Sequence, residues 1–239
     1  MDFNDEKIQQ IPSIKIEILK DGPYMVHGCP GIFQEFIIPD EYGASIDYKR
    51  GTRYDTDDPV CLCRCGKSQN KPYCDGTHEK INWDPSETAP RDSYDNMSKE
   101  YEGPMLTMID EEDLCAVARF CHVEQTNVWK LALRGNTQEQ KDVTVEKTLM
   151  CPSGRLTLED AETGENPEKK LSMSLSILED PANNVSGPIW VKGGIPIIGA
   201  DGHRYERRNR VTLCRCGKST NKPFCDATHM EVGWMDNLY

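Results

Sequence analysis

The chain has 239 residues, of which 37% are hydrophobic, and it carries 15 prolines and 18 glycines. This length suffices for one large domain or two small ones, but the composition predicts short elements around a thin core that metal sites would supplement. The net charge of −12 excludes a nucleic-acid or anionic-membrane surface, which needs clustered Lys and Arg. A partner protein with a basic docking surface, or a small molecule, fits this charge better.

Targeting signals and cysteine usage both indicate a cytoplasmic protein. The sequence has no run of about 18 apolar residues that could span a membrane. Its first residues, MDFNDEK, are acidic, whereas a secretory signal or transit peptide would be basic. The eleven cysteines are odd in number, and a reducing cytosol disfavours disulfides. We therefore expect these cysteines to ligate metal.

The predicted elements give an α+β chain with two similar modules. Alternating apolar residues at 14–19 (IKIEIL) predict a strand before a Gly-Pro turn, and residues 171–178 (LSMSLSIL) repeat this arrangement. The segment DGPYMVHG at 21–28 has a weaker echo in SGPIWVKG at 186–193. Each module is predicted to be a small antiparallel β-unit that ends in a metal loop, the first within residues 1–84 and the second within 165–239.

A linker and an insert are predicted between the modules. Residues 85–103 are polar and favour a linker, and residues 104–164 form a distinct α/β segment. Within it, VWKLAL at 128–133 predicts a strand and QEQKDVTVEKTLM at 138–150 predicts a helix.

A segment of seventeen residues occurs twice, as LCRCGKSQNKPYCDGTH at 62–78 and LCRCGKSTNKPFCDATH at 213–229. We call these segments the first loop and the second loop. Four soft or borderline ligands in such a short segment describe a metal site. Each loop has three cysteines and one histidine at identical spacing, namely Cys63, Cys65, Cys74 and His78, then Cys214, Cys216, Cys225 and His229.

The spacing groups the ligands of each loop into two pairs. Cys63 and Cys65 are separated by one residue, so an extended backbone directs both side chains to one face and one metal ion. Cys74 and His78 lie four apart, which places them on one face of a helical turn. Asp75 is the expected N-cap of that turn. Because the second loop has Ala227 where the first has a glycine, we expect that this position does not require a positive φ.

The repeated loop resembles the CDGSH iron-sulfur family, whose pattern is C-x-C-x2-(S/T)-x3-P-x-C-D-G-(S/A/T)-H. The first loop matches at every position, and the second departs only at Ala227. The resemblance implies a 2Fe-2S cluster in each loop, with the two nearby cysteines on one iron and the Cys-His pair on the more exposed iron. It also implies that the modules pair about a pseudo-twofold axis. Spacing alone leaves open a structural Cys3His zinc, which would indicate a zinc-binding interaction module.

Charge counting predicts the role of the histidine. Two ferric ions, two sulfides and three thiolates give an oxidised cluster a charge of −1, whereas a fourth thiolate would give −2. An electron is therefore easier to add, as in Rieske centres, where imidazole replaces thiolate. Protonation of the ligating nitrogen competes with iron, so we expect a proton-sensitive cluster.

The insert carries a weaker cysteine pattern. Cys115, Cys121 and Cys151, with a proline after the last, resemble divergent single-cluster ferredoxins, with Ala118 at a cysteine position. The resemblance implies a 3Fe-4S cluster, or a 4Fe-4S cluster whose fourth ligand is His122 or Asp113. In the alternative, LCAVARFC at 114–121 is a buried helix. Residues six apart then point about 240° away from each other and could not share a cluster.

These features predict an iron-sulfur protein that carries electrons or donates clusters. The expected partner is a redox or cluster-acceptor protein. A redox enzyme that reduces a small substrate at an exposed cluster is the alternative, although no acid-base constellation, phosphate loop or dinucleotide fingerprint supports it.

Overall fold

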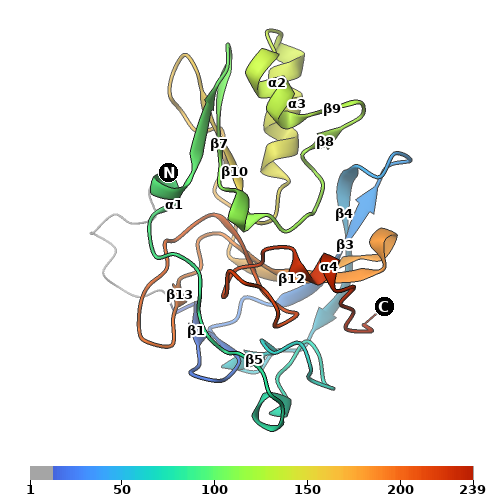
Figure 1. The fold of residues 1–239 in the computed structure, drawn as a ribbon, viewed down its shortest axis with the longest axis vertical. Coiled ribbons are helices and arrows are strands. Elements are labelled where there is room, and N and C mark those ends of the chain that lie inside the picture. Colours follow the sequence, from blue (N-terminus) through green and yellow to red (C-terminus); the bar gives the residue numbers. More distant parts are fainter. Residues whose placement is uncertain (1–12, 239) are drawn as a thin grey trace.

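A computed structural model of the chain describes residues 13–238, which divide into two regions along the long axis of the molecule (Figure 1). The insert forms the upper region, coloured green to yellow, and strands of both modules form the lower region. The acidic N-terminal residues 1–7 used in the localisation prediction lie outside the described residues. Within 13–238, none of the helices combines the length and the apolar composition needed to cross a bilayer.

A four-stranded sheet combines three strands of the first module with one of the second. Strands β1 (Lys15–Ile18), β2 (Tyr24–His27) and β5 (Val60–Leu62) pair antiparallel, as predicted. Strand β13 (Ile197–Ile198) of the second module pairs in parallel with β1. Alternate residues of β1 are buried, which fits its period-two sequence.

A five-stranded sheet is built in the reciprocal way. Strands β11 (Ser174–Asp180), β12 (Val185–Lys192) and β14 (Arg210–Leu213) of the second module pair antiparallel. The hairpin of β3 (Ile32–Pro39) and β4 (Ser45–Tyr54) from the first module extends this sheet, with β3 parallel to β11. Pairing is thus antiparallel within each module and parallel where the modules meet.

The exchanged strands share one hydrophobic core. Ile197 of the second module lies opposite Ile16 of the first, and Ile32 of the first lies opposite Leu175 of the second. All four side chains belong to the same buried cluster and are at most 3% exposed. Each module therefore supplies part of the core of the other, and burial of these side chains stabilises the pair.

The insert is a three-stranded antiparallel sheet covered by two helices. Its strands are β6 (Lys99–Glu102), β7 (Leu106–Asp110) and β10 (Leu156–Asp160), in the order β10-β7-β6. Helices α2 (Val128–Arg134) and α3 (Gln138–Leu149) contact β7 and β10, respectively. A short hairpin of β8 (His122–Val123) and β9 (Thr126–Asn127) precedes α2. Strand β6 and helix α1 (Tyr94–Met97) lie within the residues predicted as a linker.

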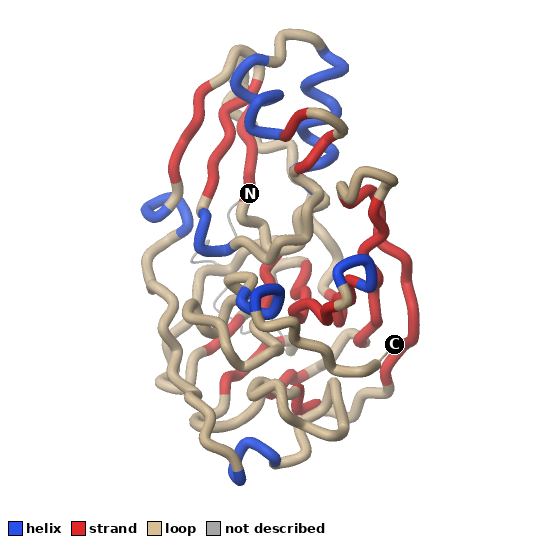
Figure 2. Tube along the Cα trace, turned by 45° about the vertical axis from the view of Figure 1, so that its right-hand side comes forward, coloured by secondary structure: helices blue, strands red, loops and turns tan. Residues whose placement is uncertain are grey.

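One predicted element of the insert is wrong. Residues 128–133 form helix α2 instead of a strand. The Asn127 side chain accepts a hydrogen bond from the Lys130 N–H and caps the helix, and the buried residues Val128 and Ala132 are four apart. The predicted helix at 138–150 is confirmed as α3. Figure 2 shows the helices of the insert together at one end of the molecule.

Candidate metal centres

The first loop brings its four predicted ligands together as two pairs. Cys63 Sγ lies 3.8 Å from Cys65 Sγ, and Cys74 Sγ lies 3.3 Å from Nδ1 of His78. Two sulfur ligands about 2.3 Å from one tetrahedral ion lie about 3.8 Å apart. Each pair therefore spans roughly one edge of a tetrahedral metal site, and Nδ1 is the imidazole nitrogen that faces the paired cysteine.

The second loop repeats this geometry in a more buried setting. Cys214 Sγ and Cys216 Sγ are 3.7 Å apart, and Cys225 Sγ is 3.4 Å from Nδ1 of His229. Cys225 is 3% and His229 4% exposed, whereas Cys74 of the first loop is only partly buried. Burial lowers the pKa of His229 to about 4, so its imidazole is neutral and available to a metal at neutral pH.

The repeated Ser and Asp residues hold both loops in shape. The hydroxyl of Ser68, and equally that of Ser219, donates to the backbone carbonyl five residues later at 2.7 Å. The carboxylate of Asp75, and equally that of Asp226, accepts from the backbone N–H groups six residues before it and two after it. These bonds fix the two ligand pairs relative to each other, which explains why more than the ligands is repeated.

The turn before each histidine differs from our prediction. Gly76 has a φ of 79° and Ala227 has a φ of 69°, so this position is left-handed in both loops. The short helices are a 3₁₀ turn at Thr77–Lys80 and α4 (Thr228–Glu231), and their N-caps, Gly76 and Ala227, lie one residue after the aspartate that we predicted as N-cap. The expectation that Ala227 excludes a positive φ was wrong, because alanine tolerates this conformation at a cost of about 1 kcal/mol.

Backbone amides and the paired thiol shift the pKa values of the two closely spaced cysteines of each loop. We call these the inner cysteines, Cys63 and Cys65 in the first loop and Cys214 and Cys216 in the second. The pKa of Cys63 is lowered to about 6, first by the Cys65 thiol and then by backbone N–H groups of Ser68, Gly66 and Lys67. In the second loop the pKa of Cys216 is lowered, first by the Cys214 thiol and then by the backbone N–H of Lys218. Since metals bind the thiolate, these N–H groups favour the ligating form.

Two glycines bring the loops into direct contact. A Cβ atom on Gly66 would lie 2.2 Å from the carbonyl oxygen of Cys216, and one on Gly217 would lie 2.4 Å from that of Cys65. The contacts are reciprocal, and they join the inner ligand of one loop to the turn of the other. Only glycine permits this approach of the two backbones.

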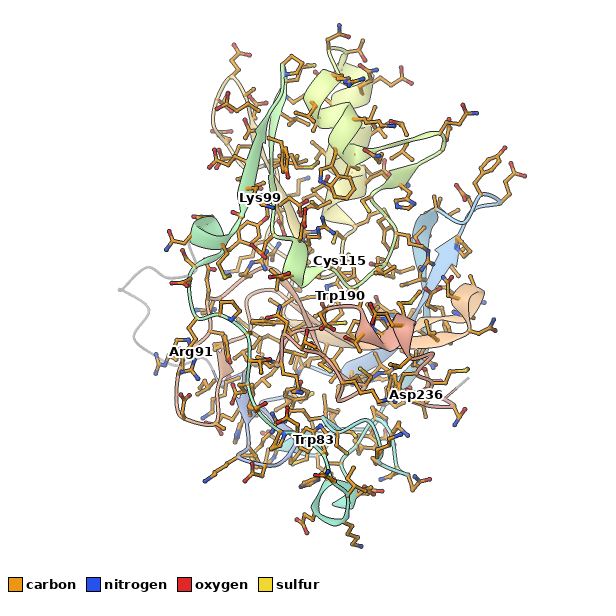
Figure 3. The ribbon with its side chains drawn as sticks, viewed as in Figure 1. Trp83, Arg91, Lys99, Cys115, Trp190 and Asp236 are labelled. Atoms are coloured by element: carbon orange, nitrogen blue, oxygen red, sulfur yellow. The ribbon has the colours of Figure 1, made fainter. Side chains whose placement is uncertain are left out.

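Two tryptophans make a second reciprocal contact. Trp83 Nε1 donates to the carbonyl of Gly217, and Trp234 Nε1 donates to that of Gly66, both at 3.2 Å (Figure 3 labels Trp83). We did not predict this role from the sequence. The signal was present, since in both copies a tryptophan follows the ligand histidine by five residues.

The second loop also contacts the insert. Asn221 Nδ2 donates to the backbone carbonyl of Asp113 at 2.9 Å, and Phe224 packs against the cluster that contains Tyr94 and Leu114. Cys115, which follows Leu114 in the chain, lies where the insert meets the modules (Figure 3). The second loop therefore lies between the first loop and the cysteines of the insert.

The three cysteines of the insert line one cavity. Cys115, Cys121 and Cys151 surround a largely apolar space of about 280 Å³. The buried-helix alternative is wrong, because residues 115–119 are irregular and have positive φ at Val117 (51°) and Arg119 (62°). Such a φ is an outlier for a β-branched residue, and strained backbone of this kind clusters at functional sites.

The candidate fourth ligands of this cavity are separated by the fold. His122 lines the cavity, whereas Asp113 lines a different pocket beside Asn221 and Phe224. Ala118, at the position of the absent cysteine, also lines the cavity. His122 is therefore the better placed of the two.

An ion pair between Arg155 and Asp110 lies at the cavity wall. Arg155 donates to Asp110 at 2.6 and 2.8 Å, and Trp129 Nε1 donates to the same carboxylate at 3.0 Å. Burial alone would lower the pKa of Arg155, but its hydrogen bonds to Asp110 and Cys115 raise it. Burial, then the neighbouring cysteines, raises the pKa of Cys121 to about 12, and the nearby Arg155 acts in the opposite direction. No sequence motif marked this arginine.

All eleven cysteines are free thiols. Across residues 13–238, no three or more Cys, His, Asp or Glu side chains converge on a point that could hold a single metal ion.

Comparison with known protein families gave three matches. Residues 21–79 and 186–230 match the family described as iron-binding zinc finger CDGSH type. Residues 101–161, between them, match the family described as divergent 4Fe-4S mono-cluster. No curated protein and no solved structure matched the chain. The order of the three matches confirms the predicted arrangement.

Proposed function

We propose that this chain is an iron-sulfur protein that binds three clusters and transfers electrons through them, because two CDGSH-type matches flank a match to a divergent 4Fe-4S mono-cluster family. The observation that carries this proposal is the position of the second loop, which contacts both the first loop and the insert. Three ligand sets on segments that contact one another favour a relay over three independent structural sites.

We assign a 2Fe-2S cluster to each loop. Each loop presents its ligands as two pairs of tetrahedral-edge length, which supports two metal ions, whereas a structural zinc needs all four ligands around one ion. The backbone N–H groups that face Cys63 support an anionic ligand set. When bound, such a cluster accepts and returns one electron, and imidazole ligation makes the uptake easier.

We assign a 3Fe-4S cluster to the cavity of the insert, with Cys115, Cys121 and Cys151 as its ligands. The three thiols around one apolar space and the hydrogen bond between Arg155 and Cys115 support this assignment. A 4Fe-4S cluster with His122 as the fourth ligand is the alternative, because His122 also lines the space.

The paired modules resemble two halves of one symmetric unit. Reciprocal strand exchange, reciprocal glycine contacts and reciprocal tryptophan hydrogen bonds support pairing about a pseudo-twofold axis. Such pairing holds the inner cysteines Cys65 and Cys216 on adjoining backbones, which suits electron exchange between the loops.

We expect the partner to be a redox or cluster-acceptor protein with a basic docking surface, because the chain carries a net charge of −12. The first loop is the accessible one, since Cys74 and His78 are only partly buried. Eleven unpaired thiols favour a reducing compartment, and we place the protein in the cytoplasm.

Iron and acid-labile sulfide per chain test the cluster content. Two irons from each loop and three from the insert give seven, and a 4Fe-4S cluster would give eight. EPR of the oxidised protein separates these cases, because an oxidised 3Fe-4S centre is paramagnetic and an oxidised 2Fe-2S centre is silent. A colourless protein with zinc in both loops would refute the proposal.

A second experiment separates electron transfer from cluster donation. We expect repeated reduction by dithionite and reoxidation to leave the iron content unchanged. Transfer of intact clusters to an apo-ferredoxin at rates comparable to electron transfer would favour donation instead.

A further inference from the structure

Arg64 and Arg215 occupy the same position in the two loops, between the inner cysteines, but they have different surroundings. Among residues 13–238, the hydrogen bonds of Arg64 all go to backbone carbonyls, those of Gly22, Leu19 and Pro85, at 2.7 to 3.1 Å. Its guanidinium is buried, since Arg64 is 2% exposed. The first loop therefore has a buried positive charge with no carboxylate in ion-pair contact among the described residues.

Arg215 instead contacts two buried carboxylates. It keeps the equivalent bonds to the carbonyls of Gly187 and Leu178, at 2.8 and 3.1 Å. It also donates to Glu179 Oε1 at 2.8 Å and to Asp236 Oδ2 at 2.6 Å, and both carboxylate side chains are 0% exposed. Figure 3 labels Asp236. The charge of Arg215 is thus balanced within hydrogen-bonding distance.

The sequence places these differences at corresponding positions. In both modules the arginine bonds the carbonyl of a leucine, and the next residue is Lys20 in the first and Glu179 in the second. Likewise, Pro85 lies two residues after Trp83, and Asp236 lies two residues after Trp234. An exposed lysine and a proline in one module are therefore replaced by buried acids in the other.

The other charges around the loops do not cancel this difference. Within the repeat itself, each loop has two lysines and one aspartate at the same positions. Glu79 lies near His78, but its side chain is 76% exposed and screened by water. Near the second loop, Asp180 forms an ion pair with Arg119, with a second contact at 3.0 Å.

We infer that Glu179 and Asp236 make the two loops unequal, so that the second loop has the lower reduction potential and an added electron resides on the first loop. This inference rests on the proposed function. An added electron makes a cluster more negative, which an uncompensated Arg64 favours and two carboxylates near Arg215 disfavour. Deeper burial of Cys225 and His229 acts in the same direction, since low dielectric disfavours added charge. One electron lost at the second loop is gained at the first, with no bond made or broken.

The direction of transfer follows from the same inequality. The second loop lies between the insert and the first loop, so an electron that reaches it moves to the first. Cys74 and His78 of the first loop are partly exposed, which makes that loop the place where a partner protein collects the electron.

Redox titration of the iron-loaded full chain at about pH 8.5, above the raised pKa of Glu179, followed by EPR of the reduced 2Fe-2S signals, tests the inference. We expect two separate midpoints in the unmodified protein. Asp236→Asn and Glu179→Gln should each raise the lower midpoint and leave the upper one in place. Glu231→Gln is the control, because it removes an exposed carboxylate two residues from His229 and should move neither midpoint.

A marker variant assigns the midpoints if the buried variants fail to fold. His78→Cys should change the line shape and lower the midpoint of the signal that has the upper midpoint in the unmodified protein, and leave the other midpoint in place. The inference is overturned if both loops titrate together, if His78→Cys changes the signal that has the lower midpoint in the unmodified protein, or if the carboxylate variants shift the upper midpoint or shift neither. Iron and sulfide analysis separates this failure from that of the proposed function. Loaded loops with one shared midpoint refute only the inference, and empty loops refute the function.

Discussion

Replacement of Gly66 by alanine should separate the two modules, whereas the same change at Gly76 should be mild. Both glycines have positive φ, 73° and 79°, so both substitutions carry the same left-handed strain and the same loss of unfolded-state entropy. The two positions differ in the room available for an added Cβ atom. A Cβ on Gly66 would lie 2.2 Å from the carbonyl oxygen of Cys216, while one on Gly76 has no neighbour within 4 Å among the described residues.

The difference between the two variants therefore isolates the steric term. An overlap of this size between backbones must push the loops apart, which costs about 1–3 kcal/mol or more. Gly76→Ala should cost less than about 1 kcal/mol, because the second loop already has Ala227 at this position. Urea unfolding followed by tryptophan fluorescence measures both, and iron content reports the sites. Equal unfolding free energies for the two variants would refute the contact between the loops.

Three further predictions address charge, cluster content and ligation. Burial raises the pKa of Glu179 from 4.5 to about 7, so the folded state keeps a proton that the unfolded state has lost between these values. The stabilisation that Glu179 gives to the folded state is therefore complete below pH 4.5 and falls by about 3 kcal/mol as the pH rises through 7. Glu179→Gln should remove this pH dependence of the unfolding free energy, measured by urea titrations at several pH values. Cys115→Ser should remove the iron of the insert and its EPR signal, while the control Cys29→Ser should leave both intact, and equal iron contents would contradict the third site. His78→Cys and His229→Cys should lower the reduction potentials and slow the acid-induced loss of visible absorbance; unchanged values would contradict the role of the histidines.

The ligand pairs could be predicted because their geometry is local. Cys63 and Cys65 are two positions apart, and Cys74 and His78 are four, so the backbone conformation of a few residues sets each distance. The backbone conformation of Ala227 was predicted wrongly from its residue type. Alanine disfavours a positive φ by only about 1 kcal/mol, and packing of the loop overrides this preference.

The arrangement of the modules could not be read in this way. The exchanged pairs Ile16 with Ile197 and Ile32 with Leu175 join residues more than 100 positions apart, and an alternating strand pattern does not specify its partner. Residues 128–133 were wrongly predicted as a strand because the segment is short. Six residues can satisfy both the alternation of a strand and the four-residue repeat of a helix.

The insert explains why a duplicated loop need not stay duplicated in function. Asn221 of the second loop is 9% exposed and bonded to the insert, whereas its counterpart Asn70 is exposed and lines an open pocket with Asp55 and Asp57. A single insert packs on one loop only, so it removes the equivalence that the paired modules would otherwise have. Where water is excluded, a nearby carboxylate acts at full strength, and where it remains, charges are screened. Glu179 and Asp236 accordingly lie beside the buried loop, where a change of charge has the greatest effect on an added electron.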